Sequence, residues 1–204
     1  MKVGVNGAVR DISDLKVGVN GAVRAVSEAY IGVNGAAKKV WPIIPVGYQV
    51  ILDTVGEGTW TCPASGKWKI EGHGSGGAGG SWRVSYSPGG GGGGSGEEYE
   101  TVFSVGQNIS YRIAKVTTGD GQDTTFGEYT FIGGKKANSV FGGKASGSLA
   151  TSGADGTGRA PGKGGYGNKN KPTQKYGNGG LGGELSNTNG ELGEAGAIIL
   201  TYLG

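Results

Sequence analysis

Apolar and polar residues alternate in short runs along much of this chain, a pattern typical of β-strands with one buried face. Such runs predict strands at residues 48–52, 59–62, 67–71, 99–105, 108–116, 126–132 and 197–203. Only a tight turn at Gly106 and Gln107 separates residues 99–105 from residues 108–116, so we expect these two runs to pair as a hairpin. No long run has the spacing of an amphipathic helix, and the pattern therefore predicts an all-β protein.

The first 41 residues contain a repeat with a period of 14 residues, which begins at Val3, Val17 and Ile31. Each unit places Asn-Gly between two short apolar arms, and Asn-Gly suits the type I′ turn of a two-residue hairpin. Isolated hairpins are marginally stable in water, so the three units are expected to need each other, a partner or a symmetric oligomer. We expect residues 1–41 to serve attachment or oligomerisation, with a homotrimer as the assembly, and a weakly ordered tail is the alternative.

The proline positions indicate where this repeat region ends. Pro42 and Pro45 interrupt strand pairing, which predicts a connector over residues 42–52 that runs into a strand. The remaining residues, 53–204, are then expected to form one glycine-rich β domain.

Glycine is the dominant feature of the composition, with 48 of the 204 residues. Between Gly72 and Gly96, 13 of 25 residues are glycine, including the run Gly89–Gly94. A flexible linker is the usual explanation of such a run, but here glycine blocks alternate with strands. Glycine also disfavours helices by about 1 kcal/mol per residue relative to alanine, so an ordinary helical enzyme is not expected.

Several glycines recur at intervals of three, as in Gly74, Gly77, Gly80; Gly177, Gly180, Gly183; and Gly190, Gly193, Gly196. Three residues per turn is the period of a polyproline-II helix, whose glycine edge carries no side chain. Layers of such helices can bond through their backbones. We therefore expect a β-sandwich-like domain with polyglycine-II-type segments, and flexible loops are the alternative.

Charge and the rare residues exclude several classes of function. The 19 basic and 16 acidic residues nearly balance, so the whole chain is not a nucleic-acid clamp. With Cys62 and His73 as the single cysteine and histidine, no intrachain disulfide or Cys/His metal cluster can form. We expect no enzyme, no cofactor and no metal site, and we interpret Cys62 as a small buried hydrophobe. No apolar run is long enough to span a membrane, and the first residues lack the apolar core of a signal peptide.

The most informative local feature is residues 158–179, which carry five basic residues and no acidic one. Aromatic rings in such a segment stack on sugars, and lysines favour anionic polymers such as wall teichoic acid. A soluble surface loop is the alternative. Trp82 and Tyr86, which stand between glycine blocks, are a second candidate for receptor contacts or for anchors under the glycine layer. The candidate receptor-binding residues are Trp82, Tyr86, Arg159, Lys163, Tyr166, Lys169, Lys171, Lys175 and Tyr176.

The order of motifs over residues 53–204 resembles the glycine-rich C-terminal domain of phage tail-fibre and tail-tip receptor-binding proteins. The similarity lies in W-T-C-P-A-S-G-K-W-K-I-E-G-H-G-S-G-G-A-G-G, a glycine run, Y-E-T-V-F-S-V-G-Q-N-I-S-Y-R-I, and a closing G-E-A-G-A-I-I-L-T-Y-L. The resemblance implies a β framework that carries packed polyglycine helices, with host receptors bound through the loops between them.

This resemblance implies a virion protein that is assembled in the host cytoplasm and released by lysis. The expected partners are other virion proteins, through the N-terminal repeats, and a host-surface glycan or wall polymer, with no nucleic acid bound and no insertion into a membrane. A capsid decoration or head-fibre protein without selective receptor binding is the first alternative. An ice-binding or elastomeric glycine-helix protein is the second.

Overall fold

The computed structural model is all-β in the part of the chain that it describes, with no helix there. The undescribed residues are 1, 6–7, 12–15, 20–21, 26–28, 34–35, 42–43, 82–88, 158–159 and 184–188, and for residues 2–41 only the backbone is described. The chain divides into two compact units, Met1–Pro45 and Val46–Gly204. The boundary falls inside the segment 42–52 that was expected as a connector.

The first unit consists of three two-stranded antiparallel sheets. They pair β1 (Lys2–Val5) with β2 (Ala8–Asp11), β3 (Lys16–Val19) with β4 (Ala22–Ala25), and β5 (Ala29–Val33) with β6 (Ala36–Trp41). The first two sheets share one register, since Val3 is opposite Arg10 and Val17 is opposite Arg24. The Asn-Gly pairs that join the strands lie outside the described residues, so the type I′ turns stay a prediction.

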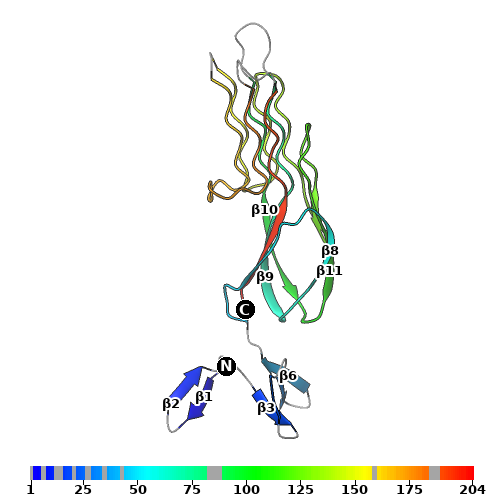
Figure 1. Ribbon diagram of the computed structural model, residues 1–204, viewed down its shortest axis with the longest axis vertical. Helices are drawn as coiled ribbons and strands as arrows, with labels where there is room; N and C mark the ends of the chain where they lie inside the picture. The colour runs from blue at the N-terminus through cyan, green and yellow to red at the C-terminus, as the bar shows by residue number, and fades with distance from the viewer. Residues whose placement is uncertain are drawn as a thin grey trace. The chain divides into compact units, whose positions relative to one another are not determined.

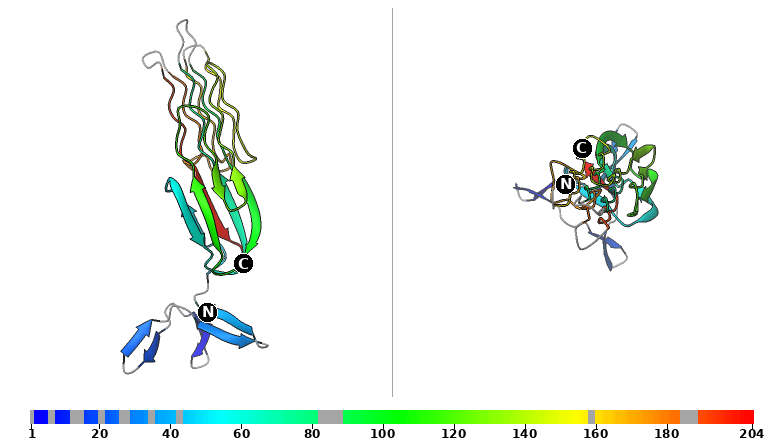
Figure 2. Two further views of the ribbon diagram at one scale, coloured as in Figure 1. Left: turned by 90° about the vertical axis from the view of Figure 1, so that its right-hand side faces the viewer. Right: turned by 90° about the horizontal axis from the view of Figure 1, so that it is seen from above.

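The second unit contains two antiparallel four-stranded sheets (Figures 1 and 2). The first sheet has the order β10 (Glu97–Phe103), β9 (Gly66–His73), β14 (Ala197–Tyr202), β7 (Gln49–Leu52). The second has the order β13 (Tyr129–Phe131), β12 (Thr124–Phe126), β11 (Asn108–Ile113), β8 (Gly56–Thr61). The predicted strand at 48–52 is thus β7, and it pairs with the closing strand β14.

Aromatic and aliphatic side chains from both sheets form one core. Trp60 of β8 and Trp68 of β9 meet edge to face with ring centroids 5.2 Å apart, and Trp60 also contacts the ring of Phe103. Cys62 is 1% exposed in this core, as expected of a small hydrophobe, and burial raises the pKa of its thiol. Such aromatic pairs add roughly 0.5–1.5 kcal/mol each to the effect of their burial.

The expected hairpin of residues 99–105 and 108–116 is wrong. β10 pairs with β9 and β11 pairs with β8, so the turn at Gly106 carries the chain from one sheet to the other. The reason is the core: Phe103 of β10 and Ile109 of β11 bury their side chains in one cluster from opposite sheets. Residues 126–132, expected as one strand, instead turn back at Gly127, where φ is +55°, and divide between β12 and β13.

Glycine-rich extended segments continue from one end of the two sheets (Figure 1). We call them the glycine bundle: residues 75–80, 89–96, 119–122, 134–139, 142–146, 149–154, 162–167, 177–183 and 191–194. Residues 89–96, which lead into β10, lie at its centre and bond through their backbones to six other segments. These six neighbours are residues 76–80, 134–139, 142–146, 149–154, 162–167 and 177–183.

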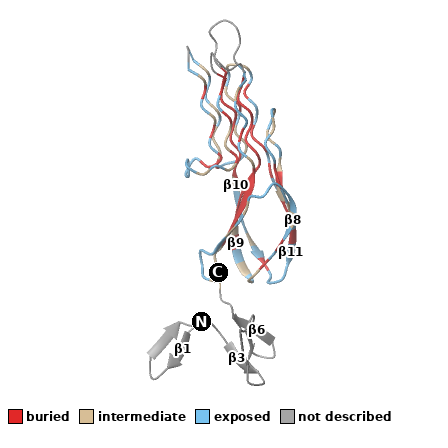
Figure 3. Cartoon of the chain, viewed as in Figure 1, coloured by how far each residue is buried: buried red, intermediate tan, exposed pale blue. Residues whose placement is uncertain are grey.

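The six neighbours also bond to one another and close a ring around the central segment. Gly180 donates to Gly77, Gly179 to Gly165, Ala154 to Lys163, Gly153 to Gly143, Lys135 to Lys144, and Ala137 to Ala78. Figure 3 shows the consequence, a buried interior that runs along the bundle even though its residues carry almost no side chains.

Hydrogen bonding in the bundle has a period of three residues. In the segment 75–80, Gly76 and Gly79 donate to Glu194 and Glu191, and Gly77 and Gly80 donate to Gly93 and Gly90. The remaining pair, Ser75 and Ala78, donates to Gln122 and Gly119. Each face of the segment therefore serves a different neighbour, unlike a strand in a sheet, which bonds to neighbours on two sides only.

Close approach of backbones explains why glycine fills these positions. A Cβ added at Gly92 would lie 1.9 Å from the carbonyl oxygen of Gly77, and one added at Gly91 would lie 2.0 Å from that of Lys163. Residues of the surrounding segments need glycine where they face the backbone of another segment, as at Gly180, where a Cβ would lie 2.1 Å from the carbonyl oxygen of Glu191. In 177–183, for example, Leu181 faces outward and is 42% exposed.

We predict that Gly92→Ala lowers the free energy of unfolding of the second unit by about 3 kcal/mol or more, because the methyl group has no space at the centre. Gly119→Ala is the matched control, since a Cβ there meets nothing within 4 Å. We expect it to change the free energy by less than about 1 kcal/mol. Denaturant unfolding measures both, and equal effects of the two substitutions would contradict the packing of the bundle.

Candidate functional site

Several segment ends of the glycine bundle meet at the end opposite the sheets. Gly96 leads into β10, so Gly89 at the other end of the central segment marks this far end. Gly89 donates to Gly183 at 3.2 Å and accepts from Gly162 at 2.9 Å, and Gly183 donates to Gly80 at 2.8 Å. The connections 82–88, 158–159 and 184–188 join chain ends that meet here. Of the expected site residues, Trp82, Tyr86 and Arg159 belong to these connections and lie outside the described residues.

A described turn, Asn138–Phe141, lies at the same end, since Gly90 donates to the carbonyl of Ser139 at 2.8 Å. Ser139 has a φ of +58° and is the single described non-glycine residue with a positive φ. The side chain of Phe141 is 62% exposed. Beside the turn is an open groove of about 410 Å³, lined by Gly80, Ser81, Lys136, Ala137, Asn138 and Ser139. The sequence analysis missed this turn, although an aromatic residue before Gly142-Gly143 was a signal of the same kind as Trp82.

Three of the expected basic and aromatic residues form a row along one neighbouring bundle segment, residues 149–154. The backbone groups of Lys163, Tyr166 and Lys169 bond in turn to Ala154, Thr151 and Leu149 of the neighbouring segment, at 2.8–2.9 Å. Lys163 and Tyr166 both accept through their carbonyls and so face the same way, whereas Lys169 donates through its amide from a turn that follows the segment; all three residues are exposed. Tyr166 is 45% exposed. Lys175 is also exposed but lies beyond this row.

The polar groups of two other expected site residues bond to side chains of the first sheet and of the residue that follows β7. Lys171 donates to Oε2 of Glu71 at 2.8 Å, and the Tyr176 hydroxyl donates to Oδ2 of Asp53 at 2.9 Å. These two hydrogen bonds hold residues 168–176 against the outer face of the first sheet. Both groups have protein partners, which makes them poor candidates for contacts with a receptor.

Glu71 is the centre of a buried polar cluster that the sequence analysis missed. Its carboxylate is 2% exposed on β9 and accepts from Asn168 at 2.8 Å, from Gln174 at 3.0 Å and from Lys171. Burial alone would raise the pKa of Glu71, but the side chains of His73, Lys171, Asn168 and Gln174 hold the charged form, and the pKa lies well below its ordinary range. The available signal was Glu71 and His73 at a spacing of two on one strand face.

His73 connects this cluster to the glycine bundle. Its Nδ1–H donates to the carbonyl of Ser95 at 2.8 Å, and Ser95 belongs to the central segment. Its Nε2 lies 2.9 Å from the Gln174 amide nitrogen and 3.1 Å from Oε1 of Glu71. With His73 fully buried and Glu71 nearly so, the cluster has no room for a substrate, and we assign it a structural role.

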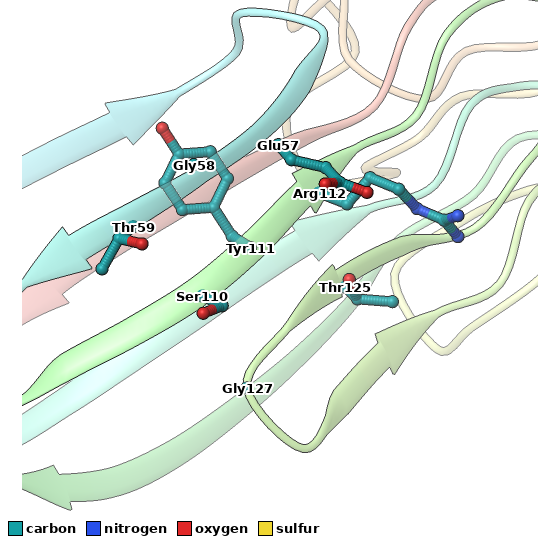
Figure 4. A pocket seen from close by; sticks show the side chains of 8 residues that line it. All are labelled: Glu57, Gly58, Thr59, Ser110, Tyr111, Arg112, Thr125 and Gly127. Carbon is teal, nitrogen blue, oxygen red and sulfur yellow. The ribbon is translucent and has the colours of Figure 1, made fainter.

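The outer face of the second sheet carries an open groove of about 750 Å³ (Figure 4). Its lining is Glu57, Gly58, Thr59, Ser110, Tyr111, Arg112, Thr125 and Gly127. The ring of Tyr111 lies over Gly58, where a Cβ would be 2.5 Å from the ring. Tyr111 also packs against the core, and the other side chains of the lining give the groove mainly hydroxyl and charged groups.

We predict that Glu71→Gln lowers the free energy of unfolding at pH 7 by about 2 kcal/mol, because Lys171 and the buried donors lose their anionic partner. The folded pKa of Glu71 is lowered, so the unfolded chain takes up the proton first. The stabilisation is therefore complete above the unfolded pKa of about 4.3 and decreases as the pH falls below it.

Denaturant unfolding from pH 7 down to acid tests this prediction, and the gap between wild type and Glu71→Gln should narrow below about pH 4.3. Glu100→Gln, which alters an exposed carboxylate paired with Lys67, is the control and should follow the wild type. Parallel curves for wild type and Glu71→Gln at all pH values would contradict the assignment.

Comparisons with known proteins add no family, because no family model and no curated protein matches the sequence. Within the described residues, no group of three or more His, Cys, Asp or Glu side chains is placed to hold a metal ion. The same part of the chain has no helix with the length and apolar character needed to cross a membrane.

Proposed function

We propose that this protein is a phage virion component, a tail-fibre or tail-tip adhesin that binds a glycan or wall polymer on the host surface without covalent chemistry. The observation that carries the proposal is the glycine bundle, whose backbone network brings described residues that flank three connections of the chain to one end. A rigid scaffold that presents several loops together is suited to recognition, because the loops can vary in sequence while the scaffold stays fixed.

The resemblance to glycine-rich tail-fibre domains supports the same function. In this proposal the bundle segments are polyglycine-II helices, with three residues per turn and bonds to neighbours on all sides. The two four-stranded sheets are the sandwich-like base from which these helices extend. Residues 1–41 attach the protein to other virion components and hold it as a homotrimer, and particles assembled in the host cytoplasm leave by lysis.

The receptor site in this proposal comprises the far end of the bundle and the exposed row on its side. Trp82, Tyr86 and Arg159 belong to connections whose flanking residues lie at that end, and Phe141 adds an exposed aromatic ring there. Lys163, Tyr166 and Lys169 belong to the side of the bundle. Lys171 and Tyr176 are left out of the site because their polar groups bind Glu71 and Asp53.

We predict strain-selective binding of the labelled full-length protein to some members of a panel of Gram-positive and Gram-negative cells. The double variant Trp82→Ala/Tyr86→Ala should lose at least about tenfold in affinity, since aromatic contacts dominate such sites. Tyr48→Ala, at an exposed tyrosine beside β7, is the matched control and should bind like the wild type. The melting temperature of each variant shows whether its fold is intact.

Two results would count against the adhesin. If the wild type bound no strain, a capsid decoration or head-fibre role would account better for the same architecture. If all strains bound it equally, selective recognition would be excluded.

A further inference from the structure

Charges on the glycine bundle are separated between two of its sides. Lys144 and Lys163 are exposed on segments 142–146 and 162–167, and Lys169 is exposed just after the second of these, while Glu191 and Glu194 are exposed on segment 191–194. Backbone bonds fix this arrangement, since 149–154 lies between the two basic segments and 191–194 bonds instead to 75–80 and 177–183. The basic side is therefore a fixed property of the packing.

Few acidic groups on the basic side compete for its lysines. Asp155 accepts a hydrogen bond from the Gly142 amide at 2.7 Å and is engaged there. Among the described residues, no ion pair involves Lys163 or Lys169, in contrast to Lys171, which is paired with Glu71. These two ammonium groups are available to an external anion.

The row Lys163, Tyr166, Lys169 follows the edge of one neighbouring segment, residues 149–154, and forms a track for a chain molecule. At a rise of about 3.1 Å per residue Lys163 and Tyr166 are about 9 Å apart, and Lys169 bonds farther along the same neighbouring segment. Tyr166 lies between the two charges with 45% of its surface exposed, so its ring can contact the C–H groups of a sugar or polyol.

We infer that this row binds a linear phosphodiester polymer, of the poly(glycerol phosphate) type, along the side of the glycine bundle. One exposed lysine contributes at most about 1 kcal/mol, so a single small anion would bind too weakly to be retained. A polymer that reaches both lysines gains both contributions for one loss of translational freedom. This inference rests on the proposed function, because it names the polymer class for the side of the same receptor site.

Binding of the full-length protein to immobilised synthetic poly(glycerol phosphate) tests the inference. We expect Lys163→Ser/Lys169→Ser to bind about tenfold more weakly than the wild type. The matched control is Lys67→Ser/Lys69→Ser, which removes the same charge from the outer face of β9, where both lysines pair with glutamates. It should change the affinity less than about twofold, and the wild-type affinity should fall steeply between about 50 and 200 mM salt.

Three outcomes would overturn the inference: no binding by the wild type, an equal loss in both double variants, or equal or tighter binding to single-stranded DNA of matched charge. No binding by the wild type would mean that the polymer has no site on the protein. An equal loss in both double variants would mean that net charge alone determines the affinity. Equal or tighter binding of DNA would indicate a different class of polyanion.

Binding of the same proteins to the cell panel separates this inference from the proposed function. Strain-selective binding that survives in Lys163→Ser/Lys169→Ser, together with no binding to the polymer, would leave the adhesin standing and remove the polymer track. Polymer binding by the wild type without any selectivity among cells would support the polymer track and would count against the selective adhesin.

Discussion

The structure of the second unit depends on complete backbone pairing of the glycine run Gly89–Gly94. Burying a peptide group without a partner costs roughly 1–3 kcal/mol, and glycine loses more conformational freedom on folding than any other residue. Both costs are offset in this run because its backbone donors and acceptors form hydrogen bonds with six surrounding segments. Only glycine permits this arrangement, since each face of the run lies against another backbone.

The sheets supply the order that such a bundle needs. Three adjacent strands of the first sheet, β10, β9 and β14, continue into bundle segments 89–96, 75–80 and 191–194. The hydrophobic core, which holds these strands, thus fixes the position at which each of the three bundle segments meets the sheet. His73 reinforces the junction by joining β9 to Ser95 of the central segment, while Glu71 holds residues 168–176 over the same sheet. The sheet and the bundle are therefore joined by continuous backbone and by buried hydrogen bonds. Such a rigid support suits the presentation of loops.

Much of this architecture could be predicted from the sequence, and the failures have physical causes. Alternation located strands such as β7 and β11, because one face of each is more buried than the other, whereas β14 is an apolar run that is buried on both faces. It could not assign β10 and β11 to different sheets, since the turn at Gly106 suits a hairpin and a sheet crossover equally well. The glycine spacing indicated three residues per turn, but which segments are neighbours depends on contacts far apart in sequence. The hydrogen bonds of Lys171 and Tyr176 depend on Glu71 and Asp53, more than 90 residues away, so composition alone could not show that these two polar groups already have partners in the protein.

Amide hydrogen exchange at Gly90–Gly94 tests the central claim most directly. If the run is the hydrogen-bonded centre of the bundle, its amides exchange only when the unit unfolds, with protection comparable to that of the core strands β9 and β14. Exchange of these amides at the rate of an unstructured chain, while β9 and β14 stay protected, would show that the run is a flexible linker and would contradict the account.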